Sequence, residues 1–259
     1  MRFNIDDAQK CEIFVSLFQH IKQFTEFVNV IFQPERMYLQ CMDNASVIIV
    51  EIILPSTWFN EYVIEASETI GINANMLSKV LNTRDKSQRI VWHNELADKL
   101  SVQFMNPEDA GKNVFNKFFE IPLLDVECDL MDIPEMEHQV DLVMSSVTFA
   151  NVVNQLRVFG ETLQIVCSEN KISMEANSIE VGKMSVDVSI DDIDEFAIEE
   201  GAELSLGFSL KYLHDISLYQ KITKSISIGL SDNTPMRSTY HLQDDAVMNF
   251  YLAPKVQDD

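Results

Sequence analysis

One helical pattern occurs twice in this chain of 259 residues. The second copy follows the first by about 135 residues and matches it step by step. The apolar positions are Phe14, Leu17, Phe18, Ile21 and Phe24 in the first copy, and Phe149, Val152, Val153, Leu156 and Phe159 in the second. A pair of shorter helical segments, 76–80 and 211–216, recurs at nearly the same offset. The duplication predicts an architecture of two like halves rather than one built around a single active site.

The charge of the chain is strongly negative. The sequence has 41 acidic and 19 basic residues, giving a net charge of −22, and 46% of it is hydrophobic, enough for one large core or two smaller ones. An acidic protein repels nucleic acid if its charge is evenly spread. Electrostatic screening at cellular salt acts over roughly 8 Å, so a local basic patch can act almost independently of distant acids. The positions of the basic residues therefore matter more than their total.

Motifs for catalysis, cofactors or metals are missing from the sequence. It contains no glycine-rich phosphate loop, no Cys-x-x-Cys and no His-x-x-x-His, and its five histidines are scattered. The acidic run 191–195 lacks the glycine and closing glutamate of a calcium loop, which favours a solvated turn. We therefore expect a protein that is not an enzyme, with no cofactor and no metal. Four separated cysteines, an acidic N-terminus and the lack of a long apolar run favour a soluble intracellular protein.

Hydrophobic periodicity predicts an α+β fold with antiparallel sheets, in which each half carries two helices on one sheet face. Helices are expected at 8–24, at the short segment ending at Leu81 and capped by Asn73 or Asn75, at 147–159 and at 209–217. Strands are expected at 46–54, 61–72, 89–92, 100–104, 115–123, 140–144, 163–167, 171–176, 179–190, 225–230, 236–242 and 247–252. The acidic segment 124–139 interrupts this rhythm. We therefore divide the chain into an N-terminal half (1–123), a connector (124–139) and a C-terminal half (140–259) with a short acidic tail.

Many of the basic residues lie in or beside the expected helices. Lys10, Lys22, Arg157, Lys211 and Lys221 do so, and Lys79 lies inside the first short helix. If the apolar faces of the helices pack on the sheets, their opposite faces form a surface less acidic than the rest. The alternative is that each lysine is an ordinary solvated surface residue.

Four segments spread over the chain resemble one family. They are Leu39-Gln40-Cys41-Met42-Asp43, Leu130-Met131-Asp132-Ile133-Pro134-Glu135, Leu210-Lys211-Tyr212-Leu213 and the C-terminal Phe250-Tyr251-Leu252-Ala253-Pro254-Lys255-Val256. In this order and spacing they resemble motifs of the proliferating cell nuclear antigen family of DNA sliding clamps. The resemblance implies a ring-forming homotrimer of the DNA clamp (processivity) fold, which encircles duplex DNA without sequence specificity. It also implies partners: DNA polymerase, the clamp loader, and other replication and repair proteins.

The resemblance assigns a DNA-facing surface to the helices. The implied residues are Lys10, Lys22, Lys79, Asn151, Asn154, Arg157, Lys211 and Lys221. Asn151 and Asn154 stand where the family has arginines, and Leu218 stands where it has a lysine. We therefore expect a less positive channel than is usual in the family, with weaker and more salt-sensitive DNA contacts.

The resemblance also implies a front-face pocket for short partner peptides of the PIP-box type, which carry a glutamine, an aliphatic residue and two aromatics. Its expected lining is apolar: Met42, Val47, Leu130, Ile133, Pro134, Pro235, Tyr251, Ala253 and Pro254. Glu169 aligns with the lysine that carries ubiquitin-type modifiers in many members, so that modification is in doubt here.

A third implied surface joins the subunits. It pairs the strand at 115–121 with the strand at 179–186 of the neighbour, and Phe119 is expected to pack on the neighbour's helix. The expected interface residues are Phe115, Phe119, Val153, Leu156, Phe159, Ile179 and Val181. Two alternatives remain at this point: a relative acting as a monomer or in a checkpoint-type heterotrimer, and an acidic protein-interaction module without a DNA role. The implied site of action is the nucleus, or the site of viral DNA replication if the protein is viral.

Overall fold

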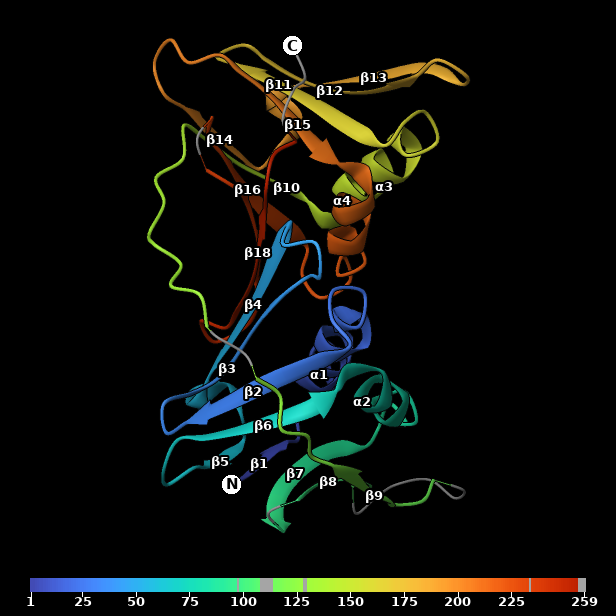
Figure 1. Cartoon of the computed structure of the whole chain (residues 1–259), viewed down its shortest axis with the longest axis vertical. Helices are drawn as coiled ribbons and strands as arrows, with labels where there is room; N and C mark the ends of the chain where they lie inside the picture. The colour runs from blue at the N-terminus through green and yellow to red at the C-terminus, as the bar shows by residue number, and fades with distance from the viewer. Residues whose placement is uncertain (97, 108–113, 128–129, 233, 256–259) are drawn as a thin grey trace. The chain divides into compact units, whose positions relative to one another are not determined.

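The element order of the first half of the chain is repeated in the second half (Figure 1). The computed structural model describes residues 1–96, 98–107, 114–127, 130–232 and 234–255. The first half contains β1 (Arg2–Ile5), α1 (Ala8–Ile21), β2 (Phe27–Gln33), β3 (Arg36–Met42), β4 (Ile48–Pro55), η1 (Ser56–Trp58), β5 (Glu61–Val63), β6 (Glu68–Asn73), α2 (Ala74–Leu81), β7 (Arg89–Leu96), β8 (Lys99–Met105) and β9 (Lys117–Pro122).

The second half contains the same twelve kinds of element in the same order. They are β10 (Val140–Ser145), α3 (Ser146–Leu156), β11 (Thr162–Ser168), β12 (Lys171–Ser178), β13 (Gly182–Val188), η2 (Ile190–Asp192), β14 (Glu195–Ile198), β15 (Leu204–Ser209), α4 (Leu210–Ser217), β16 (Ser225–Leu230), β17 (Met236–His241) and β18 (Val247–Leu252). The internal repeat predicted from the helices therefore extends to the whole topology of the chain.

The strand pairing is duplicated as well. In the first half the strand order is β5-β1-β7-β8-β9 in one series and β4-β3-β2-β6 in the other. In the second half the equivalent series are β14-β10-β16-β17-β18 and β13-β12-β11-β15. Every pairing with a resolved register is antiparallel. The α+β class and the antiparallel sheets predicted from the sequence are thus confirmed.

The chain forms two compact units, whose limits differ from those of the halves. The first unit comprises Met1–Asn44, Val50–Met131 and Leu242–Met248, and the second comprises Ala45–Ile49, Asp132–His241 and Asn249–Asp259. The main boundary, between Met131 and Asp132, falls inside the predicted connector. Within the first unit α1 packs beside α2, and within the second α3 packs beside α4 (Figure 1).

Local signals explain where the helices begin and end. The side chains of Asp7, Asn73 and Ser145 each accept a hydrogen bond from the third residue beyond them, and so cap α1, α2 and α3. Asn73, one of the two caps considered from the sequence, is the residue used. The helix expected at 8–24 ends earlier, at Ile21, and Phe24 instead lies in the following turn with its ring buried. An apolar side chain in a turn at helical spacing mimics one more turn of helix. The helix expected at 147–159 likewise runs over Ser146–Leu156.

Several predicted strands have different limits in the structure, and two of them differ for a clear local reason. The strand expected at 61–72 is two strands, β5 and β6, because residues 64–67 leave the sheet between them. The strand expected at 179–190 begins only at Gly182, whose φ of 101° allows a turn that most side chains would strain. Ile179 and Val181 therefore lie in the turn before β13. Strands β1, β2, β3, β14 and β15 were not predicted; β2, for example, is a nearly continuous apolar run without clear alternation.

The first unit has an aromatic core. Phe3, Phe14, Phe18, Trp58 and Trp92 are all 0% exposed. The ring centroid of Trp92 lies 5.3 Å from that of Phe3, 5.2 Å from Phe14 and 5.8 Å from Phe18. These residues come from α1, β1, η1 and β7, so a single cluster of rings holds the helix against the sheet.

The core of the second unit is more aliphatic, and its main ring cluster is smaller. Tyr219, Tyr240 and Phe250 pack with centroids 5.5 to 6.3 Å apart. The hydroxyl of Tyr240 donates a 3.0 Å hydrogen bond to the carbonyl oxygen of Ile216 in α4. This bond ties the helix to β17 and satisfies a buried polar group.

Candidate functional site

All but one of the cations expected from the sequence are exposed on helices α1 to α4 or just after them. In the first unit Lys22 and Lys79 are exposed. In the second unit the exposed residues are Asn151, Asn154, Arg157, Lys211 and Lys221. The apolar faces of the same helices are buried, for example through Leu17 in α1, Leu77 in α2, Val153 in α3 and Leu213 in α4. Each helix pair therefore has one face in its core and a polar face in solvent.

Lys10 is placed differently from the expectation. Its ammonium group lies 2.5 Å from a carboxylate oxygen of Asp244 and donates a 2.8 Å hydrogen bond to the carbonyl oxygen of Trp58. The ammonium also lies 5.5 Å from the centre of the Trp58 ring, and only 15% of the side chain is exposed. The charge of Lys10 is thus neutralised inside the first unit, so we leave it out of the DNA-facing surface.

Polar contacts organise the helix face of the second unit. The Nδ1 atom of His214 lies 3.0 Å from Oδ1 of Asn154, which joins α4 to α3. Burial, with the nearby Arg157 guanidinium, lowers the pKa of His214, so its imidazole is neutral at pH 7. The ammonium of Lys211 lies 3.6 Å from the carboxylate of Asp215 and 4.4 Å from the centre of the Tyr212 ring.

A cleft beside this face gathers further positive charge. It has a volume of about 370 Å³, and its lining includes Arg157, Lys211 and Lys255, with Glu161 as the one acidic residue. Lys255 was not singled out from the sequence. Its position follows from two contacts: its amide donates to the carbonyl of Gly207, and its ammonium donates to Oγ1 of Thr162, each over 2.7 Å.

The residues expected to line the peptide pocket come from both units. The first unit contributes Met42 and Leu130, which are 39% and 50% exposed. The second unit contributes the other seven: Pro134 is exposed, Tyr251 is buried, and Val47, Ile133, Pro235, Ala253 and Pro254 are half-buried. Exposed proline and aliphatic side chains are suited to an apolar peptide, but the pocket as a whole stays a prediction.

The first unit holds a cleft of about 490 Å³ beneath the start of the connector. Its lining includes Phe27, Met42, Val126 and Met131, three of which are exposed apolar side chains. Two side-chain amides fix the connector above it. Gln40 exchanges two hydrogen bonds with the backbone of Met131, of 3.0 and 2.7 Å, and the amide of Asn29 donates to the carbonyl of Val126 over 2.8 Å.

A close backbone contact anchors the connector further. The amide of Leu124 donates a 2.9 Å hydrogen bond to the carbonyl of Gly71 in β6. A Cβ atom on Gly71 would lie 2.3 Å from the carbonyl oxygen of Leu124, so only glycine fits at this position. Cys128 and residue 129 of the connector lie outside the described residues.

The two strands expected at the subunit interface are both terminal strands of their series, β9 in the first unit and β13 in the second. Phe115 is 72% exposed, Ile179 106% and Val181 54%. Phe119 packs on Phe104 of its own sheet, with centroids 5.6 Å apart. The exposed phenylalanine of β9 is Phe118, at 64%. Adjacent phenylalanines in a strand face opposite sides, and the sequence alone did not show which one is turned outward.

The remaining expected interface residues lie in α3 or just after it. Val153 and Leu156 are buried in the core of their own unit, and Phe159 after the helix is half-buried. Of the α3 set, only Phe159 thus keeps appreciable surface for a neighbouring subunit. Glu169 is exposed, and its carboxylate accepts a 3.0 Å hydrogen bond from the amide of Gly201.

Within the described part of the chain, no cluster of histidine, cysteine, aspartate and glutamate has the geometry of a metal site. Nor does any helix there have the length and apolarity required to span a membrane. Cys11, Cys41 and Cys167 are buried, and burial raises the pKa of Cys11 and Cys167 to about 11. The thiols of Cys11 and Cys167 are therefore protonated and unreactive at pH 7.

Comparisons with known proteins agree with this fold over nearly the whole chain. Residues 6–130 match the family model described as the N-terminal domain of proliferating cell nuclear antigen, and residues 132–255 match that of its C-terminal domain. Two relatives are each named DNA polymerase sliding clamp. The one from Thermococcus fumicolans is 25% identical and the one from Pyrococcus abyssi 23%, and each alignment covers 86% of this chain and 87% of the relative.

A solved structure has the same fold. The crystal structure of the PCNA2–PCNA3 complex from Sulfolobus tokodaii matches with a TM-score of 0.86 at 20% identity. The match covers 99% of this chain and all of the other chain. The boundary between the two family models, at residue 131, coincides with the boundary between the two compact units.

Proposed function

This chain belongs to the proliferating cell nuclear antigen family, and on that premise we propose that it is a DNA polymerase processivity factor, a sliding clamp. In this proposal a closed ring of subunits encircles duplex DNA and tethers polymerase and other replication and repair proteins to it. The role is topological and requires no catalytic group in the chain itself. We further propose that the ring acts where DNA is replicated, in the nucleus or at a viral replication site.

The duplicated topology supports the ring. Strand β18 is the repeat equivalent of β9, and β13 is the equivalent of β4. Within the second unit, the amide of Ala253, just after β18, donates a 3.0 Å hydrogen bond to the carbonyl of Val47, just before β4. The chain thus already joins the segments that follow β18 and precede β4. Because β9 corresponds to β18 and β13 corresponds to β4, β9 of one copy should pair with β13 of the next copy.

Such an interface is head-to-tail, because β9 and β13 are different surfaces. Head-to-tail interfaces generate rings when the rotation between copies closes on itself. Three copies bring together six like halves, which makes a pseudo-sixfold hoop. Both terminal strands are then paired, which removes edges that could otherwise template aggregation.

The charge distribution suits sliding rather than tight binding. The exposed cations on the helices are few: Lys22 and Lys79 in the first unit, and Arg157, Lys211 and Lys221 in the second. Phosphate contacts supply affinity without sequence specificity, and a closed ring stays on DNA without strong contacts. Asn151 and Asn154 add hydrogen-bonding groups but no charge. The net charge of −22 opposes DNA binding on the other surfaces.

The mass in solution is the first test of this function. The proposal expects a stable assembly near three times 29.7 kDa, measured by analytical ultracentrifugation or mass photometry. A complex that forms only with a related second chain would instead favour a heteromeric assembly, comparable to the PCNA2–PCNA3 complex from Sulfolobus tokodaii. A protein that stays monomeric at all concentrations, alone and with its paralogues, would contradict the proposal.

The DNA role has its own test. Loading on a long primed template should make the cognate polymerase processive, and this effect should depend on a clamp loader. Lys22→Ala combined with Lys79→Ala should lower DNA affinity and reduce the slope of log affinity against log salt by about 0.9 for each phosphate that is no longer neutralised. Lys171→Ala, an exposed lysine on β12, is the matched control. An equal effect from the control would argue against a specific helix surface.

The partner pocket is tested through Ile133, a half-buried aliphatic residue in an acidic connector. Ile133→Ala should weaken binding of a PIP-box-type peptide by about tenfold, since anchor residues typically contribute about 1–2 kcal/mol or more. Isothermal titration calorimetry measures this directly. Unchanged affinity would remove Ile133 from the pocket.

A further inference from the structure

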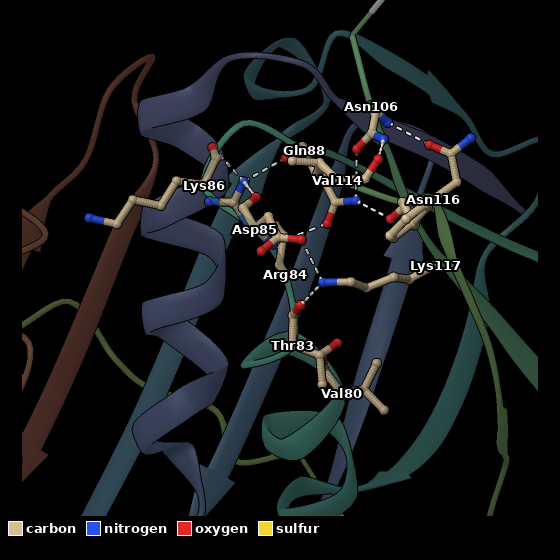
Figure 2. Close-up of polar contacts among 11 residues, drawn as sticks. Val80, Thr83, Arg84, Asp85, Lys86, Gln88, Asn106, Val114, Asn116 and Lys117 are labelled. Atoms are coloured by element: carbon tan, nitrogen blue, oxygen red, sulfur yellow. Dashed lines mark hydrogen bonds and ion pairs between the residues drawn. The ribbon is translucent and has the colours of Figure 1, made fainter. Parts of the chain in front are cut away.

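Six polar residues form a connected hydrogen-bond network beside strand β9 in the first unit (Figure 2). We call them the polar brace: Arg84, Asp85, Gln88, Asn106, Asn116 and Lys117. They join the loop that follows α2 to the two ends of the segment that leads from β8 into β9. The brace contains no apolar side chain, so it does not stabilise the unit by hydrophobic burial.

Gln88 is the centre of the brace and is only 1% exposed. Its Nε2 atom donates to Oδ1 of Asn106 over 2.9 Å and to the carbonyl oxygen of Phe115 over 2.7 Å. Its Oε1 atom accepts a 3.0 Å hydrogen bond from the amide of Asp85. Both amide protons and the amide oxygen are thus used. A shorter side chain would leave three partners unsatisfied, each at a cost in free energy.

Asn106, just after β8, and Asn116, just before β9, are joined to each other and to the chain around them. The amide of Asn106 donates to Oδ1 of Asn116 over 2.8 Å, and Nδ2 of Asn106 donates to the carbonyl of Val114 over 2.7 Å. With the bond from Gln88 to Phe115, three consecutive residues before β9 are each held by a hydrogen bond to a residue of the brace (Figure 2). The position at which β9 starts is therefore fixed by polar contacts.

The cations of the brace are used inside the unit. The ammonium of Lys117 bonds to the carboxylate of Asp85 over 2.7 Å and to the carbonyl of Thr83. The guanidinium of Arg84 donates to the carbonyl of Gln88 over 2.5 Å and to the carboxylate of Glu12 in α1 over 2.6 Å. Only 3% of the Arg84 side chain is exposed. The brace therefore connects the first helix to the start of β9.

We propose that the polar brace positions Phe115 and strand β9 for docking against a second copy of this chain. The ring of Phe115 is 72% exposed although its own carbonyl is held by a buried amide. Fixing an exposed aromatic anchor before association lowers the entropy cost of ordering it in the complex. In this role Gln88 is a positioning residue: it lies behind the docking surface and touches the partner only through the strand it holds.

This inference rests on the proposed ring, in which β9 meets another copy. Its particular content is that docking depends on Gln88 and on the asparagines, which are not among the interface residues expected from the sequence. A purely structural role would predict loss of unit stability without a selective effect on association. A positioning role predicts the reverse for a variant that lacks Gln88 or an asparagine of the brace. Residues 115–118 should open faster and the subunits should associate more weakly, while the unit still unfolds cooperatively.

The experiment uses the full chain with Gln88→Ala. We expect the subunit dissociation constant, measured by analytical ultracentrifugation over a dilution series, to rise roughly three- to tenfold. We also expect faster hydrogen exchange at the amides of residues 115–118, measured by mass spectrometry or NMR. Gln33→Ala is the matched control, because Gln33 lies in β2, outside the sheet that contains β9, and its amide oxygen accepts a 2.8 Å hydrogen bond from Nε of Arg36. The control should change neither quantity.

Asn116→Ala is the second variant, since this exposed residue can be replaced with little risk to folding. It removes one bond of the brace and should change both quantities in the same direction but less. If wild type assembles, and both variants assemble as tightly with unchanged exchange at 115–118, the positioning role is overturned while the ring stands. If wild type fails to assemble at all, the proposed ring fails, and the docking role of the brace fails with it. In that case exchange in the monomer still shows whether Gln88 orders the strand.

Discussion

The two halves of the chain share their topology element by element, yet the terminal strands of the two units carry different side chains on their surfaces. In the first unit, the ring of Phe118 in the terminal strand β9 and the ring of Phe115 just before that strand are exposed to solvent. The terminal strand of the second unit, β13, has seven residues and carries cross-strand ion pairs to β12, Lys183 with Glu175 at 2.6 Å and Lys171 with Asp187 at 3.7 Å. Exposed aromatic rings thus distinguish one terminal strand, and cross-strand ion pairs distinguish the other.

The exposed helix faces of the two units also differ in their charged side chains. The first unit has Lys22 and Lys79 in solvent, while Lys10 is occupied by Asp244. The second unit has more exposed polar side chains on its helices, and part of its charge is balanced, as in the pair of Lys211 with Asp215. The two halves therefore share a framework but differ in which side chains their helix faces expose.

The largest difference between the halves should appear in their cores. Trp92→Ala removes a fully buried ring that contacts Phe3, Phe14 and Phe18, and should lower the free energy of unfolding of the first unit by about 3–5 kcal/mol. In the second unit, Tyr240→Phe removes only the hydroxyl that bonds Ile216 and should cost about 1 kcal/mol. Urea denaturation followed by hydrogen exchange resolves the two units. Equal losses in both units would contradict the contrast between an aromatic core and a more aliphatic one.

The terminal strands provide the next contrast. Phe118→Asp places a charge on the exposed face of β9 and should raise the subunit dissociation constant by more than about tenfold, because an aromatic anchor is lost and a charge is desolvated. The circular dichroism spectrum should stay unchanged, since Phe118 is already 64% exposed in the single chain. Val63→Asp is the control and should have little effect, because Val63 is also an exposed apolar residue but lies on β5, at the opposite end of the same sheet. Normal assembly of Phe118→Asp would show that β9 docks through its other face.

The sequence predicted the framework better than the surfaces. The helical repeat and the cap at Asn73 are local signals, and both are confirmed. The polar brace could not be predicted in this way, because Gln88, Asn106 and Phe115 are separated by up to 27 residues and meet only through the sheet. Lys10 shows the same limit: helical spacing placed it on a helix, but its partner Asp244 lies 234 residues away. Local patterns predict elements, whereas long-range polar contacts decide which charges remain available.

A smaller difference in stability is expected from the N-terminal caps of α1 and α4. Asp7 caps α1 by accepting a 2.8 Å hydrogen bond from the amide of Lys10, whereas the side chain of Ser209, the residue that precedes α4, makes no capping bond. Asp7→Ala should therefore destabilise the first unit by about 1 kcal/mol, and Ser209→Ala should change the second by much less. Thermal denaturation of the two variants beside wild type measures this. Equal losses would show that the Ser209 hydroxyl does cap α4 in solution.

Acidification should give the smallest effect and should fall mainly on the second unit. Burial lowers the pKa of His20 in the first unit and of His138 and His214 in the second, each from an ordinary value of 6.5. The unfolded chain then binds more protons than the folded one, so stability is present above pH 6.5 and is lost as the pH falls from there towards the lowered folded pKa. Burial raises the pKa of Asp215, which acts in the opposite sense and only at lower pH, as the pH falls through that raised value.

His138 allows this last difference to be traced to one group. A Cβ atom on Gly229 in β16 would lie 2.3 Å from its ring, and the charged groups that act on it are Arg237 of β17, which lowers its pKa further, and Asp141 of β10, which raises it. His138→Gln removes the titrating group, so the free energy of unfolding of the second unit should depend less on pH between about 7.5 and 6. Urea titrations at both pH values, resolved by hydrogen exchange for each unit, measure the change. An unaltered pH dependence would mean that His214 carries the effect, because it is the other histidine of this unit whose pKa is lowered by burial.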